Sequence, residues 1–252
     1  MTECIKTDRE RKWISLRAPY NLEMTGHAVC RSYALGKMMK SNGMSVAVYA
    51  LTTKDNKLYP NGIPCWRALF GPYFVDEFLT NRDNPNPDRF FWMFNPNKLP
   101  YKMEECQKLM IILDVNNGWC VYEVDIAART LHVMDPMMTT SNEGSMERKH
   151  QKNAEYMLHC LCKCLREWYP KWHFSTFQWT YKYNYGMHPS CSREESGFYV
   201  LHYIKEFDGV RLKTFPTHEL IENLRKEMAY EILAVRGNMA DFPNELYVRI
   251  FT

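Results

Sequence analysis

The sequence predicts an α+β fold in one large domain, and three observations carry this prediction. Helical patterns come first, short apolar runs follow in the middle of the chain, and helical patterns return at the end. The chain has 252 residues, of which 46% are hydrophobic and 14% aromatic, so it can bury a sizeable core. No internal repeat divides the chain. We expect residues 1–30 to be an N-terminal extension packed on a domain that spans 31–252.

The residues near the N-terminus are expected to anchor this extension in the core. Trp13, Ile14 and Leu16 are the large apolar residues of this stretch. Further on, the spacing of apolar residues predicts a helical region over 34–51, broken near Asn42 and Gly43 because this pair favours turns.

Two clusters of turn-forming residues predict loops over 54–65 and 81–89. The stretch between these loops, 66–79, is apolar and aromatic, and it predicts a helix packed on the core.

Strands are predicted in the centre of the chain, where runs of bulky apolar residues lie between polar turns. Two of these runs, 120–125 and 130–134, are joined by four residues and predict a hairpin. The other predicted strands cover 89–94, 109–115, 172–179 and 246–251.

The last third of the chain predicts helices. A polar loop over 139–150 leads into a helix over 151–168, and another helix is predicted over 197–207. Thr217 is suited to be the N-cap of a final helix, in which apolar residues recur every fourth position. These residues are Leu220, Leu224, Met228 and Ile232.

Charge and composition argue against several classes of function. Thirty-two basic and 29 acidic residues give a net charge of +3, too balanced for a nucleic-acid-binding surface. No apolar run is long enough to predict a membrane span. We expect the protein to act in the nucleus or the cytoplasm, because nine cysteines without a secretory signal suit a reducing compartment.

The cysteines do not predict a metal site. Cys160, Cys162 and Cys164 alternate with other residues, whereas zinc sites use pairs of cysteines separated by two or more residues. We expect them to be small buried residues, and we expect neither a metal nor a cofactor.

Two segments, 109–138 and 190–209, and more weakly a third, 41–51, carry a resemblance to a known family. They resemble the catalytic domain of the ubiquitin-like-protein-specific (SUMO) proteases, in particular a divergent plant and transposon-associated branch. The resemblance covers about residues 30–210. It implies a papain-like cysteine peptidase fold, with a small central sheet flanked by helices.

The resemblance also implies which positions should carry the chemistry. In that family a strand ends in His-Trp, the next strand ends in Asp, and a Gln precedes an Asp-Cys-Gly that opens a helix. Trp119 matches the Trp, so Gly118 stands at the histidine position, and Asp135 follows 17 residues later. Ser196 stands at the cysteine position, and Ser190 at the Gln that supplies the oxyanion hole.

These differences predict a domain without catalytic activity. A cysteine peptidase needs a thiolate whose pKa is lowered by an imidazolium. A serine needs a base to take its proton, and with glycine at 118 that base is gone. We further expect Asp135 to have no imidazole to orient.

Three residues are weighed as substitutes for the lost groups. His132 precedes Asp135 by three positions, so on a strand it points to the opposite face. His188 and Cys191 lie in the segment before Ser196, and either of them could approach it. We expect all three to be ordinary residues.

The predicted function is therefore that of an inactive peptidase-like domain that acts by binding a protein, possible partners including a ubiquitin-like modifier. Two alternatives remain open. One is a residual hydrolase, of the cysteine or serine type, that uses Ser196 or Cys191. The other is a structural or regulatory subunit that forms an oligomer.

The family's helix near 40–49 normally carries a Trp and acidic residues that cover the modifier's tail. Here this stretch has neither a Trp nor an acidic residue, so the resemblance does not predict a tunnel for that tail.

Overall fold

The computed structural model describes most of the chain. The described residues are 8–17, 21–58, 67–81, 86–97, 99, 101–137, 144–172, 175–184, 191–241 and 243. Among them, no helix has the length and apolar character needed to cross a membrane.

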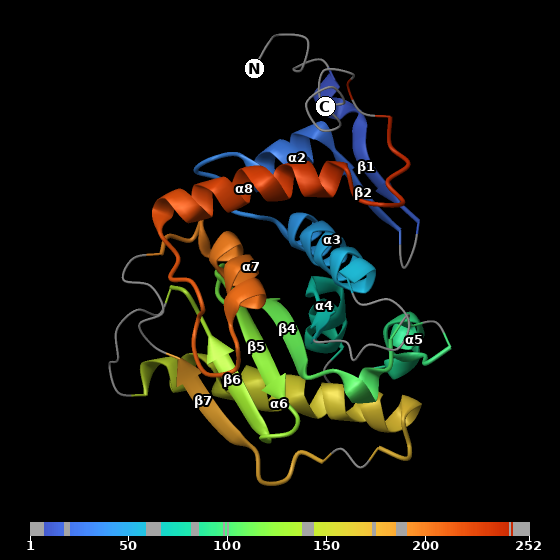
Figure 1. The fold of residues 1–252 in the computed structure, drawn as a ribbon, viewed down its shortest axis with the longest axis vertical. Coiled ribbons are helices and arrows are strands. Elements are labelled where there is room, and N and C mark those ends of the chain that lie inside the picture. Colours follow the sequence, from blue (N-terminus) through green and yellow to red (C-terminus); the bar gives the residue numbers. More distant parts are fainter. Residues whose placement is uncertain are drawn as a thin grey trace.

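A five-stranded sheet forms the centre of the molecule (Figure 1). Its strands lie in chain order. The pairs β4–β5 and β5–β6 are antiparallel, and the outer pairs β3–β4 and β6–β7 are parallel. The strands are β3 (Arg67–Phe70), β4 (Lys108–Asp114), β5 (Trp119–Asp125), β6 (Thr130–Met134) and β7 (Thr180–Asn184).

The turn between β4 and β5 fixes the position of the residues that follow it. Asn116 and Asn117 both adopt positive φ, 57° and 60°, and the Val115 amide donates to the Gly118 carbonyl at 2.9 Å. This is the geometry of a two-residue type I′ hairpin, which asparagine tolerates better than most residues. The turn places Gly118 and Trp119 at the start of β5.

Two helices cover the two faces of the sheet (Figure 1). Because side chains alternate along a strand, β4 and β5 contribute to both faces. On one face Met110, Ile112 and Val121 share a core with α7 (Ser196–Glu206). On the other face their neighbours share a second core with the long helix α6 (Ser145–Trp168).

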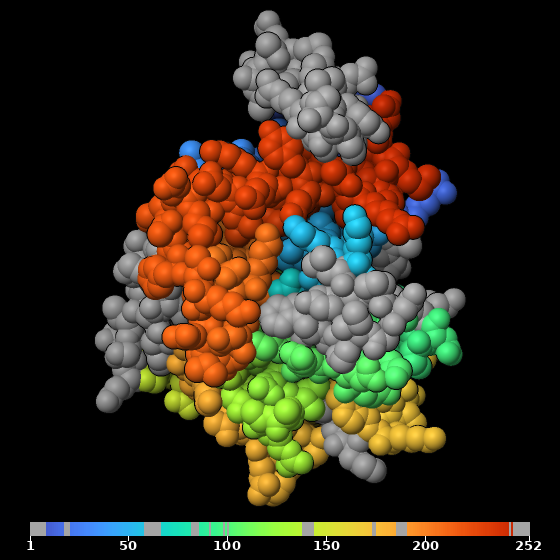
Figure 2. Space-filling view, in the orientation of Figure 1, coloured from blue at the N-terminus to red at the C-terminus, as the bar shows by residue number. Residues whose placement is uncertain are grey.

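A helical layer lies beyond α7. Helix α8 (His218–Leu233) crosses over α2 (Gly26–Tyr33), α3 (Ser41–Leu58) and α7, and its apolar stripe joins their core. With α7 it forms a continuous surface in the space-filling view (orange and red, Figure 2). The remaining elements are η1 (Asp8–Glu10), α4 (Pro72–Thr80), η2 (Pro87–Phe90), α5 (Phe91–Phe94) and η3 (Met103–Glu105).

A hairpin near the N-terminus is held by the segment after α8. Strands β1 (Lys12–Leu16) and β2 (Leu22–Thr25) form a separate two-stranded sheet. The Asn238 side chain accepts from the Ser15 amide at 2.9 Å and donates to the Trp13 carbonyl at 3.0 Å. Residues more than 220 positions apart therefore complete one small unit.

Most predicted elements from residue 109 onward are confirmed: β4, the β5–β6 hairpin, α7 and α8 lie within one or two residues of the predicted ranges. The Thr217 hydroxyl caps α8 by accepting from the Leu220 amide at 3.2 Å. The predicted anchors are confirmed as well, since Trp13, Ile14 and Leu16 are all buried.

The helical region predicted over 34–51 is wrong in its first part, because α2 ends at Tyr33 and α3 begins at Ser41. Gly43 does not break a helix. The Tyr33 hydroxyl donates to its carbonyl at 2.6 Å, and a Cβ at 43 would lie 2.7 Å from the Ser32 Cβ. Glycine is present because α2 and α3 approach closely there.

Two further predictions around β3 are wrong in part. The predicted loop over 54–65 is helical as far as Leu58, where α3 ends, and 59–65 lie outside the described residues. The helix predicted over 66–79 is confirmed in α4, but 67–70 form the strand β3 and residue 66 lies outside the described range. Pro72 occupies the first turn of α4, where its missing N–H is not needed.

The strand predicted over 89–94 is also wrong, since these residues form the end of η2 and the short helix α5. Phe90 and Phe94 are four positions apart, so a helical turn places both on one side. Their rings pack on Phe74, with centroid distances of 5.1 and 6.0 Å. Packing has overridden the strand preference of the aromatic residues.

Two elements in the C-terminal half begin at other residues than predicted. Helix α6 begins at Ser145, so the predicted loop over 139–150 is helical from that residue on. The strand predicted over 172–179 lies at 180–184 instead, because the positive φ of Gln178 interrupts the extended backbone. The strand predicted over 246–251 falls beyond the residues that the structure describes.

Candidate functional site

The structure brings together two residues of the predicted motifs, Trp119 and Ser196. The Trp119 amide donates to the Ser196 hydroxyl at 3.1 Å, and that hydroxyl donates to the Arg193 carbonyl at 2.9 Å. Ser196 is fully buried at the N-terminus of α7. Because its one proton is committed to a carbonyl and no solvent reaches it, Ser196 is a packed structural hydroxyl in this conformation.

Met39 packs against Trp119 and the first turn of α7. The Trp119 indole donates to the Met39 carbonyl at 2.8 Å. A Cβ on Gly197 would lie 3.0 Å from the Met39 Cβ and 3.2 Å from the Trp119 ring. Met39 and Trp119 are both buried, so Gly197 is the residue that lets α7 approach them.

Gly118 has no room for an imidazole in the structure as it stands. A Cβ at this position would lie 2.5 Å from the Met137 sulfur, closer than such atoms approach in proteins. A histidine at 118 would therefore require Met137 to move. We call Met39, Gly118, Trp119, Asp135, Met137 and Ser196 the Ser196 site.

Asp135 is buried and held by two basic side chains from α6. Its Oδ2 accepts from the Lys149 ammonium at 2.6 Å and from His150 Nε2 at 2.9 Å, and its Oδ1 accepts from the Met137 amide. Because a carboxylate only accepts, Nε2 carries a proton, and Nδ1 forms a hydrogen bond with the Tyr122 hydroxyl at 2.9 Å. Burial alone would raise the pKa of Asp135, but the bonds from His150 and Lys149 hold it below its ordinary value.

The expectation that Asp135 lacks an imidazole is therefore wrong. His150 is fully buried between Asp135 and Tyr122, on the sheet face covered by α6. No local pattern in the sequence indicates this contact, since His150 falls in the stretch predicted to be a loop. Once α6 is known to begin at Ser145, His150 lies near the strand end that carries Asp135.

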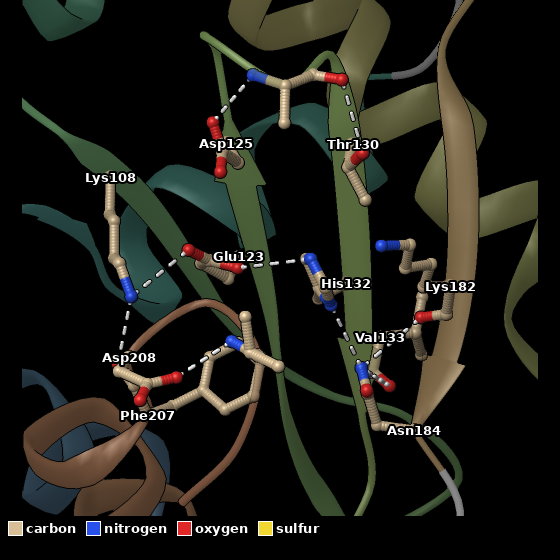
Figure 3. Close-up of polar contacts among 12 residues, drawn as sticks. Lys108, Glu123, Asp125, Thr130, His132, Val133, Lys182, Asn184, Phe207 and Asp208 are labelled. Atoms are coloured by element: carbon tan, nitrogen blue, oxygen red, sulfur yellow. Dashed lines mark hydrogen bonds and ion pairs between the residues drawn. The ribbon is translucent and has the colours of Figure 1, made fainter.

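Of the three residues weighed as substitutes, the structure describes His132 and Cys191. His132 lies on the opposite face from Asp135, as predicted, beside Glu123 at 3.9 Å and Asn184 at 3.4 Å (Figure 3). Burial raises the pKa of the Cys191 thiol, and the nearby Glu195 raises it further, so Cys191 is not a thiolate near neutral pH. His188 and Ser190 lie outside the described residues.

No metal-ligand cluster is found in the described part of the chain. Cys160, Cys162 and Cys164 are buried in α6. Burial raises the pKa of Cys162 to about 12 and that of Cys164 higher still, so these thiols keep their protons and pack as small apolar groups.

A central sheet between two helical layers, with the N-terminus of α7 against the start of β5, defines a papain-like cysteine peptidase fold. Solved structures share it. One is the SUMO protease Ulp1 with its catalytic cysteine oxidised to a sulfonic acid, with a TM-score of 0.61 and 13% identity. The match covers 93% of this chain and 96% of that one.

This chain belongs to the Ulp1 protease family. The model of that family's C-terminal catalytic domain matches residues 72–237, more than half of the chain. The Ulp1 domain in complex with Smt3, the yeast ortholog of SUMO, has a TM-score of 0.59 and 15% identity, over 93% and 96% of the two chains. The Ulp1-like SUMO protease of Chaetomium thermophilum has a TM-score of 0.58 and 12% identity, over 94% and 90%. No curated protein matches the sequence.

Proposed function

We propose that this domain is catalytically inactive and acts by binding another protein. The observation that carries the proposal is the state of Ser196, which is buried, donates its proton to Arg193 and has no base within the described residues. Asp135, which would orient a base, is bonded to Lys149 and His150 instead. That Gly118 and Ser196 are the family's catalytic positions remains a prediction from the sequence.

A ubiquitin-like modifier is the first partner to test. One solved relative is a complex with a SUMO ortholog, and this chain shares its fold over 93% of its length. The closed packing of Met39 on Trp119 leaves a modifier no obvious way to bring its tail to Ser196. We therefore propose binding without cleavage.

The test is a cleavage assay on SUMO and ubiquitin-like precursors, run beside a binding assay with the same proteins. We expect no turnover by the natural protein. The double variant Gly118→His/Ser196→Cys should gain no turnover, because residue 196 stays buried and Asp135 stays hydrogen-bonded to Lys149 and His150. Adding Met137→Ala relieves the contact at position 118 but should not restore turnover.

Turnover by the natural protein would overturn the proposal. A Cys191→Ala variant then tells a thiol-dependent hydrolase from a serine-dependent one. Measuring the mass in solution tests the other alternative, since a stable oligomer without a partner would favour a structural subunit.

A further inference from the structure

A groove of about 820 Å³ lies along α3, away from Ser196. Its floor is apolar and buried, and includes Val48, Phe70 and Phe74. Its sides are half-exposed aromatic residues, among them Tyr49 and Trp92. Part of α3 (cyan) reaches the surface between α8 and the green segments (Figure 2). This volume is in the range of sites that bind small ligands or short peptide segments.

The charges of the groove are all of one sign. Lys57 and Arg236 are its charged lining residues among those described, and no described acid lines it. Both are exposed, and within the described residues neither side chain forms an ion pair. The other cation of α3, Lys54, is paired with Glu231 at 2.8 Å.

The two cations come from two segments that line the groove, α3 and the stretch after α8. The Tyr49 hydroxyl donates to the Arg236 carbonyl, which places the Arg236 backbone beside the middle of α3. Lys57 follows Tyr49 by eight residues, which is about 12 Å along a helix. An extended peptide covers this length with about four residues.

We propose that this groove binds a linear, acidic segment of a partner protein, with apolar side chains on the floor between two carboxylates that pair with Lys57 and Arg236. The inference rests on the proposed function only in taking the ligand to be a protein. The half-exposed sides favour a peptide over a small molecule, because the rest of the partner can continue into solvent. A neutral or basic segment would leave both cations unpaired.

The test uses fluorescence anisotropy with three labelled peptides on the whole protein. The first is Glu-Leu-Phe-Leu-Glu, the second replaces both acids by lysine, and the third replaces the three apolar residues by serine. We expect saturable binding of the first alone. Reversing two charges that contribute roughly 0.5–1 kcal/mol each should weaken it about tenfold or more.

The variant Lys57→Glu/Arg236→Glu should lose the acidic peptide and gain the lysine peptide. Its matched control is Arg31→Glu/Lys152→Glu, which changes the net charge equally at exposed positions on α2 and α6. This control should bind like the natural protein. Thr53→Trp, which fills the groove from α3, should weaken binding of the acidic peptide.

The proposal is overturned if no peptide binds, if the two charge variants behave alike, or if an aromatic carboxylate binds as tightly as the peptide. Displacement of the peptide by a folded modifier that itself binds through Lys57 and Arg236 would also overturn it. Cleavage of a modifier precursor would contradict the proposed lack of catalysis but would not bear on peptide binding in the groove. The two failures are therefore distinguishable.

Discussion

The Ser196 site and the α3 groove differ in whether their polar and charged groups have partners within the protein. At the Ser196 site the hydroxyl, the carboxylate and the indole all have partners within the protein, and two methionines occupy the remaining space. In the groove, aromatic side chains are half-exposed and Lys57 and Arg236 have no acidic partner among the described residues. The polar groups of the Ser196 site are therefore part of the core, whereas the cations of the groove are available to a ligand.

The largest effect on stability is expected at Asp135, in the Ser196 site. Asp135→Ala leaves the Lys149 ammonium and the buried His150 without their acceptor, so the free energy of unfolding should fall by about 3–5 kcal/mol. Urea denaturation measures it. Asp114→Ala, at the exposed end of β4, is the control and should change stability by less than about 0.5 kcal/mol. A small effect at Asp135 would mean that it is not structural.

A second large effect is expected at Arg225, a buried residue of α8 that joins α8 to the segments before α3 and before α7. Its guanidinium donates to the carbonyls of Ala34, Lys37 and Glu194, and stacks 4.0 Å above the Phe198 ring. Arg225→Leu should cost about 3 kcal/mol, because three carbonyls lose charged donors.

The same variant should also speed the reaction of Cys191 with a thiol reagent, followed by mass spectrometry, since Glu194 lies close to it in the chain. Lys226→Leu, an exposed neighbour on α8, is the control. An unchanged reaction rate would show that Cys191 stays protected without the hydrogen bonds of Arg225.

A pH-dependent effect is expected at Glu123, which is fully buried between Lys108 and His132 (Figure 3). Burial raises its pKa to about 7, against the attraction of Lys108, whose ammonium lies 3.5 Å away. The folded protein therefore keeps a proton that the unfolded chain releases from about pH 4.5 upward, and stability falls as pH rises between these values. The loss is about 3 kcal/mol at most.

Glu123→Gln should remove this slope, so the difference between the two stability curves from pH 4.5 to 8 is the measurement. Other charged groups face Glu123 from the neighbouring strands and from the loop after α7, and they contribute to both curves. They are Lys108, Asp125, His132, Lys182 and Asp208. Parallel curves would mean that Glu123 titrates normally.

The smallest effect is expected at position 118, where Met137 lies close to Gly118. Gly118→Ala places a Cβ 2.5 Å from the Met137 sulfur, and moving this side chain should cost about 1 kcal/mol. In a Met137→Ala background the cost should vanish, so the two changes should not be additive. Additive effects would mean that Met137 does not limit position 118.

The sequence predicted the sheet centre and its covering helix well, and the groove not at all. The run from 109 to 134 and helix α7 are local patterns whose apolar period alone indicates their structure. The Asp135–His150 bond depends on where α6 begins, which a polar stretch does not reveal. The groove joins α3, α4, α5 and Arg236, and a surface made from segments so far apart in the chain has no local pattern to predict it.

The bonds from Asn238 to Trp13 and Ser15 have a consequence for how the chain folds as it is made. The β1–β2 hairpin is translated early, but the side chain that completes it is added more than 220 residues later. At the usual rates of synthesis the hairpin waits roughly 10–45 s for its partner. During that time its buried face, with Trp13 and Ile14, is exposed to chaperones or to other nascent chains, so this end of the molecule should be the last to become resistant to proteases.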